Sequence, residues 1–264
     1  MQTRKSIPRQ YCTNTKMKFI KNLLRELRQQ PLVDELNKQL VIDNDIIISL
    51  NINNKKLIDE INFKTTEEQR AEFWNNKYPK NDIIYLARED KIRFDVRNFI
   101  IPKDIIIQNI LKENKLIGKD NDETALNCLI WIINNIKWVS DNSQFGFNEQ
   151  WDFPSECIYR KKADCEGGTH LLISMWRNAN IPAYRCKAAI GWANNGKDKF
   201  YHSYPIYLRE SDNEWVVMDW NSAEVSAIEV KDRTKAKENP FYNNPDFTFN
   251  DEYSWSQKTF TIER

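Results

Sequence analysis

One cysteine, one histidine and one aspartate of this chain have surroundings that suit nucleophilic catalysis. Cys165 lies in ADCEGGTHLLISMW (163–176), directly before two of the six glycines and at the start of a helix-like apolar run. Unpaired N–H groups and the helix dipole favour a thiolate at such a start. His202 follows 37 residues later (202 − 165), and Asp219 another 17 (219 − 202). Together they supply the thiol, imidazole and carboxylate that thiol-based acyl transfer requires.

The histidine and the aspartate lie in two strand-like runs, FYHSYPIYL (200–208) and EWVVMDW (214–220), joined by RESDN. Directly opposed residues of an antiparallel hairpin have a constant index sum, and a turn centred on residues 210 and 211 makes it 421. His202 and Asp219 add to 421. We therefore predict that they face each other on one side of the sheet, with Cβ atoms about 4.5 to 5.5 Å apart.

Residues near the cysteine could complete a site for acyl transfer. Asp164 is a suitable N-cap for the helix that begins at the cysteine. The backbone N–H of Cys165 can supply one oxyanion donor. For the second donor, Gln144, Gln150 and the indole of Trp151 are candidates, and we favour Gln150.

The remaining cysteines and the second histidine have simpler interpretations. Five cysteines at wide spacing, without a C-x-x-C pair and with only two histidines, argue against a disulfide framework or a zinc site. We expect Cys12, Cys128 and Cys186 to pack as small apolar groups, and Cys157 to do so rather than act as a resolving thiol. His170, five residues into the cysteine helix, is expected to be a polar surface or supporting group.

The pattern along the chain predicts a helical extension followed by an α+β domain. Residues 1–80 are expected to be mainly helical, with two short amphipathic helices separated by Pro31 within residues 17–41. Residues 81–264 form the second expected domain. Its predicted strands are 83–87, 91–101, 183–192, 200–208 and 214–220, and its predicted helices are 104–112, 124–137 and one that begins at the cysteine. We expect the tail from residue 232, rich in Pro, Asn and aromatic residues, to be an irregular wrap.

Composition narrows the partners. The net charge is +1, from 39 basic and 38 acidic residues, which gives no overall reason to expect nucleic acid. Residues 1–30 hold eight Lys or Arg and one acid, so their basic face (Lys18, Lys21, Arg25 and Arg28) could dock on a partner, although a solvated helix face explains it equally well. No signal peptide or membrane span is evident. We expect a cytoplasmic protein; the Asn-, Ile- and Lys-rich composition is also compatible with a phage or virion-associated one.

The sequence resembles the transglutaminase-like superfamily, including its bacterial cysteine proteinases, from about residue 125 to residue 221. The resemblance is carried by IKWVSD (136–141), FGFNEQWDFPSECIYRKKADCEGG (145–168), NIPAYRCKAAIG (180–191), YHSY and WVVMDW. It implies a papain-like α+β fold, with a nucleophile helix packed on an antiparallel sheet, and a catalytic triad of Cys165, His202 and Asp219. The chain departs from the family pattern at Ala163, where glycine is usual, and at Gly167, where an acidic residue is common.

Two functional hypotheses follow. The first is a cysteine protease, amidase or transglutaminase acting on protein or peptide amide bonds, with hydrolysis favoured over transamidation. The second is a non-catalytic structural or interaction protein, such as a bacterial or phage assembly component, because folds outlast their chemistry. No cofactor is expected, and we predict no metal site at residues 164–168. The reasons are that Gly167 lacks a ligand, Asp164 is used in capping, and Glu166 should point about 100° away from the cysteine.

Overall fold

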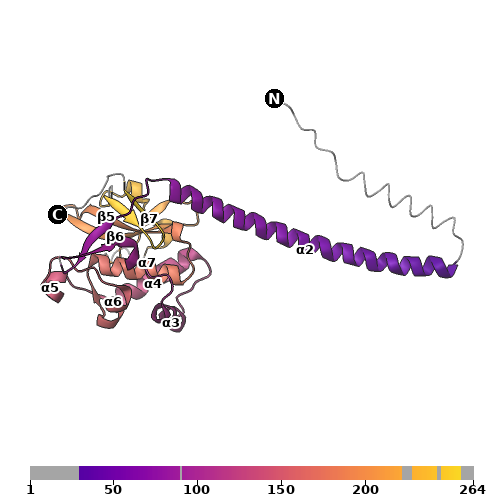
Figure 1. Cartoon of the computed structure of the whole chain (residues 1–264), viewed down its shortest axis with the longest axis horizontal. Helices are drawn as coiled ribbons and strands as arrows, with labels where there is room; N and C mark the ends of the chain where they lie inside the picture. The colour runs from indigo at the N-terminus through magenta and orange to yellow at the C-terminus, as the bar shows by residue number, and fades with distance from the viewer. Residues whose placement is uncertain (1–29, 90, 222–227, 243–244, 257–264) are drawn as a thin grey trace, which may run out of the picture. The chain divides into compact units, whose positions relative to one another are not determined.

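A computed structural model describes residues 30–89, 91–221, 228–242 and 245–256 (Figure 1). The chain divides into two compact units, Met1–Glu67 and Glu68–Arg264. The second of the two short helices predicted around Pro31 is instead part of one long helix, α2 (Gln30–Asn76), which begins beside this proline. Proline is accepted there because the first turn of a helix lacks N–H partners anyway. The first predicted helix, including its basic face, lies outside the described residues.

The second unit is built on a five-stranded antiparallel sheet, which confirms the α+β fold class. The strand order is β7-β6-β5-β8-β9. Strand β5 pairs with β6 along its whole length, Cys186 to Asn194 against Tyr207 to Lys199. The strands are β5 (Cys186–Asn194), β6 (Lys199–Leu208), β7 (Trp215–Val217), β8 (Phe247–Phe249) and β9 (Ser254–Ser256).

Helix α7 (Cys165–Asn178) is the central element of this unit, and nearly all its residues are buried. It contacts β5 and β6, and also three further helices (Figure 1). Alternate residues of β5, Cys186, Ala188 and Ile190, join the same buried cluster as the apolar residues of α7. The surrounding helices are α3 (Ile105–Glu113), α4 (Asn121–Asn135) and α6 (Pro154–Arg160), with the short α5 (Asp141–Phe145) nearby in sequence.

Two small strand pairs flank this core. Strand β1 (Ile84–Arg88) pairs with β2 (Ile92–Asp95), and β3 (Lys137–Trp138) runs parallel to β4 (Lys162–Ala163), which leads directly to the cysteine. The strand predicted at 91–101 is shorter than expected. Asp95 ends it because its carboxylate accepts the N–H of Arg97 and caps a 3-10 helix, Val96–Phe99.

The C-terminal tail is more regular than the sequence suggested. The prediction of an irregular wrap was wrong for β8 and β9, which extend the sheet beyond β5. Phe247 and Phe249 alternate with a partly exposed Thr248 and bury both rings, the period of a strand with one covered face. Short 3-10 turns, Val230–Asp232 and Ala236–Glu238, precede them.

Candidate active site

Cys165 is the first residue of α7 and is partly exposed. The strand β4 delivers the chain to this point, and Asp164 caps the helix as predicted, its Oδ1 accepting the Gly167 N–H at 3.2 Å. The other described cysteines, Cys128, Cys157 and Cys186, are buried and free, as packing groups should be. The thiol of Cys165 is therefore the accessible one among the described residues.

The two glycines after the cysteine are required by close packing. A Cβ on Gly168 would lie 2.0 Å from the Trp220 ring, so only glycine lets this indole lie against the first turn of α7. The indole N–H is then donated to the Cys165 carbonyl oxygen at 3.3 Å. A Cβ on Gly167 would lie 3.1 Å from the Ala163 Cβ and 3.2 Å from the Cys157 sulfur, so this position is also tight. The Gly-Gly pair thus fixes the nucleophile turn against the segment that carries Asp219.

The structure brings His202 and Asp219 together. His202 Nε2 lies 2.8 Å from Asp219 Oδ2, and the two residues are 5% and 2% exposed. The Tyr242 hydroxyl donates to the same oxygen at 2.7 Å, and the Asn221 N–H donates to Oδ1 at 3.0 Å. Burial acts to raise the pKa of this carboxyl, but the hydrogen bonds and charge of His202 and the Tyr242 bond outweigh burial and lower it. Asp219 is thus held as an anion next to the imidazole.

The hairpin that carries this pair has a different register from the one predicted. Val217 pairs with Ile206 and Trp215 with Leu208, so opposed residues add to 423 rather than 421. The turn is centred one residue later because Asn213 adopts a left-handed conformation and its N–H returns to the Arg209 carbonyl. An index sum that changes by two keeps every side chain on its predicted face. His202 and Asp219 therefore bond although they are not directly opposed.

The thiol is bonded to a carboxylate that was expected to point elsewhere. Cys165 Sγ lies 3.0 Å from Glu166 Oε2, so the prediction that Glu166 points away from the cysteine was wrong. The helix sets only the direction of the Cα–Cβ bond, and the long Glu side chain bends back. The thiol also receives the backbone N–H of Ser203, the residue after His202. Burial raises the pKa of the thiol to about 12, and the charge of Asp164 adds to the rise. In this conformation the thiol is the proton donor.

Three buried acids surround the nucleophile turn. Asp141 and Asp164 join Glu166, with side-chain hydrogen bonds between these carboxyl groups. Burial is the largest cause that raises the pKa of all three, and for Asp164 and Glu166 the rise is large. One ligand atom each from Asp164, Cys165 and Glu166 lies within 4.8 Å of the others, the one such grouping of possible metal ligands among the described residues. The predicted absence of a metal here stays a prediction.

All three candidate oxyanion donors are anchored by hydrogen bonds, and the Gln144 side-chain amide donates to the Val139 carbonyl oxygen at 2.8 Å. Gln150 Oε1 accepts the Glu89 N–H at 3.0 Å, which fixes the orientation of the side-chain amide. The Trp151 indole N–H is donated to Glu149 Oε1 at 2.6 Å, and the ring is buried. In this conformation Trp151 has already used its donor. Their role toward a substrate stays a prediction.

His170 is a core residue, so the expectation of a polar surface group was wrong, and its role as a supporting group stays a prediction. It is completely buried, and its ring stacks on Phe99 and lies 5.0 Å from the Trp151 ring. Burial lowers its pKa to about 3, so the imidazole is neutral. Tyr242, by contrast, was missed. It lies in the tail 23 residues beyond Asp219, and no local pattern in the sequence links it to that residue.

Comparisons with solved structures give low overall similarity. LapG of Legionella pneumophila, EGTA-treated, is 16% identical with a TM-score of 0.45, covering 60% of this chain and 87% of that one. Its calcium-bound form is 18% identical with a TM-score of 0.40, covering 58% and 88%. A protein of Cytophaga hutchinsonii, described as a candidate cysteine protease, is 19% identical with a TM-score of 0.31, covering 53% and 45%. No curated protein matches the chain.

The family model of the transglutaminase-like superfamily matches residues 108–220. This segment runs from α3 through the nucleophile helix to Trp220, and it includes Cys165, His202 and Asp219. It agrees with the family resemblance that the cysteine turn and the following strands carry in the sequence. Residues 108–220 of this chain therefore form a transglutaminase-like domain.

Proposed function

We propose that this protein catalyses acyl transfer from amide bonds of a protein or peptide to water, with Cys165 as the nucleophile. The observation that carries the proposal is the buried His202–Asp219 hydrogen bond of 2.8 Å, together with a partly exposed thiol at a helix N-terminus that is bonded to the backbone of Ser203, the residue after His202. Such a pair fixes the orientation of an imidazole and stabilises its protonated form. A purely structural role would not require this arrangement next to a thiol.

The pairing indicates which ring nitrogen acts as the base. Asp219 is held as an anion, so the proton of the neutral imidazole lies on Nε2, and Nδ1 carries the lone pair. Nδ1 takes the thiol proton, and the thiolate adds to the substrate carbonyl carbon. Collapse of the tetrahedral intermediate breaks the C–N bond, and the imidazolium returns its proton to the leaving amine. Water, deprotonated by the same nitrogen, then releases the acid and the free thiol.

The chain supplies groups for the charge that develops on the carbonyl oxygen. The Cys165 N–H lies at the N-terminus of α7, where backbone donors and the dipole favour negative charge. The Gln150 side chain, oriented by its bond to Glu89, is the proposed second donor. An amine in place of water would give transamidation. Dye release from a labelled casein and incorporation of monodansylcadaverine into casein distinguish the two outcomes.

The thiol must exchange partners before it reacts. Its proton is donated to Glu166 in the resting conformation, so turnover requires rotation of the sulfur toward His202. This resting bond, with a thiol pKa raised to about 12, is also the specific observation that favours the second candidate function, a non-catalytic interaction protein that retains the fold. The two functions differ in whether the imidazole ever takes the proton.

Alkylation by iodoacetamide separates them. For an enzyme, wild-type protein is modified at Cys165 near neutral pH, and His202→Ala slows this modification by about 10-fold or more, because the base that generates the thiolate is lost. Cys157→Ala is the matched control, since the buried Cys157 has no such base and its loss leaves the rate unchanged. Two results together would support the non-catalytic function. Alkylation would be equally fast in wild type and His202→Ala, and the wild type would show no casein cleavage that depends on Cys165.

A further inference from the structure

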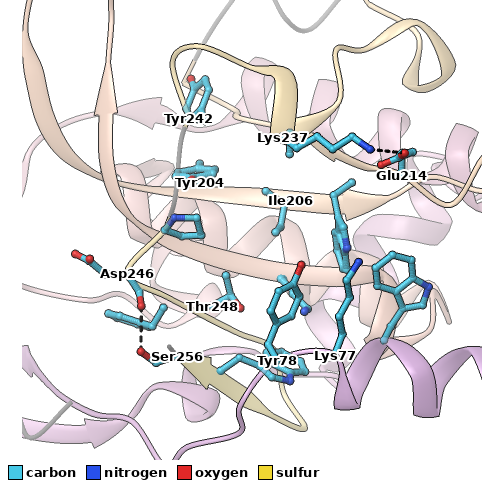
Figure 2. A pocket seen from close by; sticks show the side chains of 17 residues that line it. Lys77, Tyr78, Tyr204, Ile206, Glu214, Lys237, Tyr242, Asp246, Thr248 and Ser256 are labelled. Carbon is cyan, nitrogen blue, oxygen red and sulfur yellow. Dashed lines mark hydrogen bonds and ion pairs between the residues drawn. The ribbon is translucent and has the colours of Figure 1, made fainter. Parts of the chain in front are cut away.

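A cavity of about 580 Å³ lies within residues 68–264, and none of the three proposed catalytic residues lines it (Figure 2). Its volume is in the range of pockets that hold small organic ligands, roughly 300–1,000 Å³. Seven of the 17 residues that line it are aromatic. They include Trp74, Tyr78, Tyr204, Trp215, Tyr242 and Trp255.

The cavity lies on the face of the five-stranded sheet opposite the face that packs against α7. Cys186 and Ala188 of β5 belong to the core shared with α7, so Lys187 between them points to the opposite face. Its register partner on β6 is Ile206, which also lines the cavity. Figure 2 shows Tyr204 and Ile206 along one strand, with Tyr78 and Lys77 on the other side of the cavity.

Lys187 is the unusual residue of this site. It is 1% exposed, and its Nζ lies 3.9 Å from the Trp255 ring centroid and 4.9 Å from those of Tyr78 and Trp215. Within the described part of the chain, this amine has no carboxylate or hydrogen-bond acceptor as a partner. Buried lysines are normally paired, because an unpaired charge away from water is costly. Three aromatic faces replace only part of the lost hydration.

Positive charge exceeds negative charge among the residues that line the cavity. Lys77 and Lys237 lie at its wall, and Glu214 is already paired with Lys235 and Lys237 at 3.2 and 2.7 Å. Asp246 also lines the cavity and is engaged in other contacts. Burial and then the charge of Lys77 lower the pKa of Lys187 to about 7. An anion beside this amine would oppose both effects and favour its protonated form.

We propose that this cavity is a binding site for a planar aromatic monocarboxylate, whose carboxylate pairs with Lys187 and whose ring packs among the surrounding indoles and phenols. The one buried amine, Lys187, matches a single negative charge, and the positive charge of Lys77 at the wall adds to the attraction for an anion. Stacked and edge-on contacts with Trp215, Trp255 and Tyr78 favour a flat apolar body. The proposal does not rest on the reaction proposed at Cys165, although the cavity shares Tyr242 with that site.

Calorimetric titration with 2-naphthoate tests the proposal, with 2-naphthamide as the uncharged probe of the same shape. We expect saturable 2-naphthoate binding to the full-length wild type and to Cys165→Ala, and about 10-fold or more weaker binding of 2-naphthamide. Lys187→Met keeps an apolar side chain of similar length and removes the charge, so it should weaken 2-naphthoate to the level of the amide. Absence of binding to the wild type, or equal binding by Lys187→Met, would overturn the proposal.

A second measurement on the wild type covers the case in which Lys187→Met does not fold. An amine with a lowered pKa reacts with trinitrobenzenesulfonate at neutral pH when the reagent can enter. We expect saturating 2-naphthoate, but not 2-naphthamide, to slow modification of Lys187, read by peptide mass spectrometry. The exposed Lys197 is the internal control and should react equally throughout. Unchanged modification of Lys187 in 2-naphthoate would contradict the assignment.

Discussion

Buried carboxyl groups lie in two regions around Cys165, and their pKa values are shifted in opposite directions. Asp219 receives hydrogen bonds from an imidazole, a phenol and a backbone N–H, and its pKa is lowered in spite of burial. Asp164 and Glu166 are similarly buried, but their pKa values are raised. Burial and the charge of Glu166 raise the pKa of Asp164, and burial and the neighbouring acidic groups raise that of Glu166. One region keeps a charge, and the other keeps protons.

The difference shows that the partners of a carboxyl group, rather than its depth, decide its protonation state. A charged Asp219 is what a base needs in order to become an imidazolium. When charged, Asp164 and Asp219 both raise the pKa of the Cys165 thiol. Protonation of Asp164 removes its share of that rise, whereas the charge of Asp219 stays.

The largest expected effect on activity comes from removing the negative charge of Asp219, in the first region. Asp219→Asn keeps the size of the side chain, but its amide N–H can donate a hydrogen bond to His202 Nε2 and so favour the wrong tautomer. If Asp219 orients the catalytic imidazole as proposed, the rate of casein cleavage should fall by about 10³- to 10⁴-fold. Cleavage rates, with circular dichroism to verify the fold, measure this.

Tyr242→Phe is the graded control for that substitution. It removes one of the donors to Asp219 and leaves the His202 bond in place, so the loss of rate should be about 10-fold, the value of one hydrogen bond to a charged group. A loss in Asp219→Asn no larger than in Tyr242→Phe would mean that the aspartate does not orient the imidazole.

In the second region, the substitution Glu166→Gln is expected to stabilise the protein at neutral pH. Because the pKa of Glu166 is raised in the folded protein, the folded state keeps a proton that the unfolded chain loses above its ordinary carboxyl pKa. Stability therefore falls as the pH rises through the window between these two pKa values. Glu166→Gln should raise the melting temperature at pH 7.5, by about 2 to 4 °C for each 1 kcal/mol gained, and the gain should vanish near pH 4.

Glu156→Gln is the matched control of opposite sign. Burial acts to raise the pKa of Glu156, but its bonds with Arg88 outweigh this and lower it. Its contribution is present at neutral pH and is lost as the pH falls through the lowered pKa. The melting temperature of Glu156→Gln should fall at pH 7.5 and approach that of the wild type in acid. Shifts of the same sign in both variants at pH 7.5 would contradict the contrast between paired and unpaired acids.

Local patterns in the sequence were sufficient for the nucleophile helix, its cap and the side of the sheet on which His202 and Asp219 meet. Side-chain alternation survives an error of two in the index sum, so the wrong turn centre did not separate the pair. The depth of His170 was not predictable from helix geometry alone. It depends on Phe99, which reaches it from a 3-10 helix far away in the sequence.

Long-range packing explains most of what the sequence could not show. Tyr242 and the strands β8 and β9 come from the tail, where no periodicity long enough to predict a strand is present. The acid group formed by Asp141, Asp164 and Glu166 joins separate segments of the chain. The buried Lys187 reads locally as one polar residue in a strand, and only the tertiary structure encloses it in aromatic rings.

The smallest expected effect is that of divalent cations on the second region. Calcium in proteins takes about six to eight oxygen ligands, whereas Asp164, Cys165 and Glu166 offer two carboxylates and a soft thiol. One oxygen of Asp164 already accepts the Gly167 N–H, and the hydrogen bonds among these acids require protons that a cation would have to displace. We therefore expect the melting temperature of the wild type in EGTA to equal that in calcium chloride. A calcium-dependent increase that is absent in Glu166→Gln would show instead that a cation replaces the shared protons.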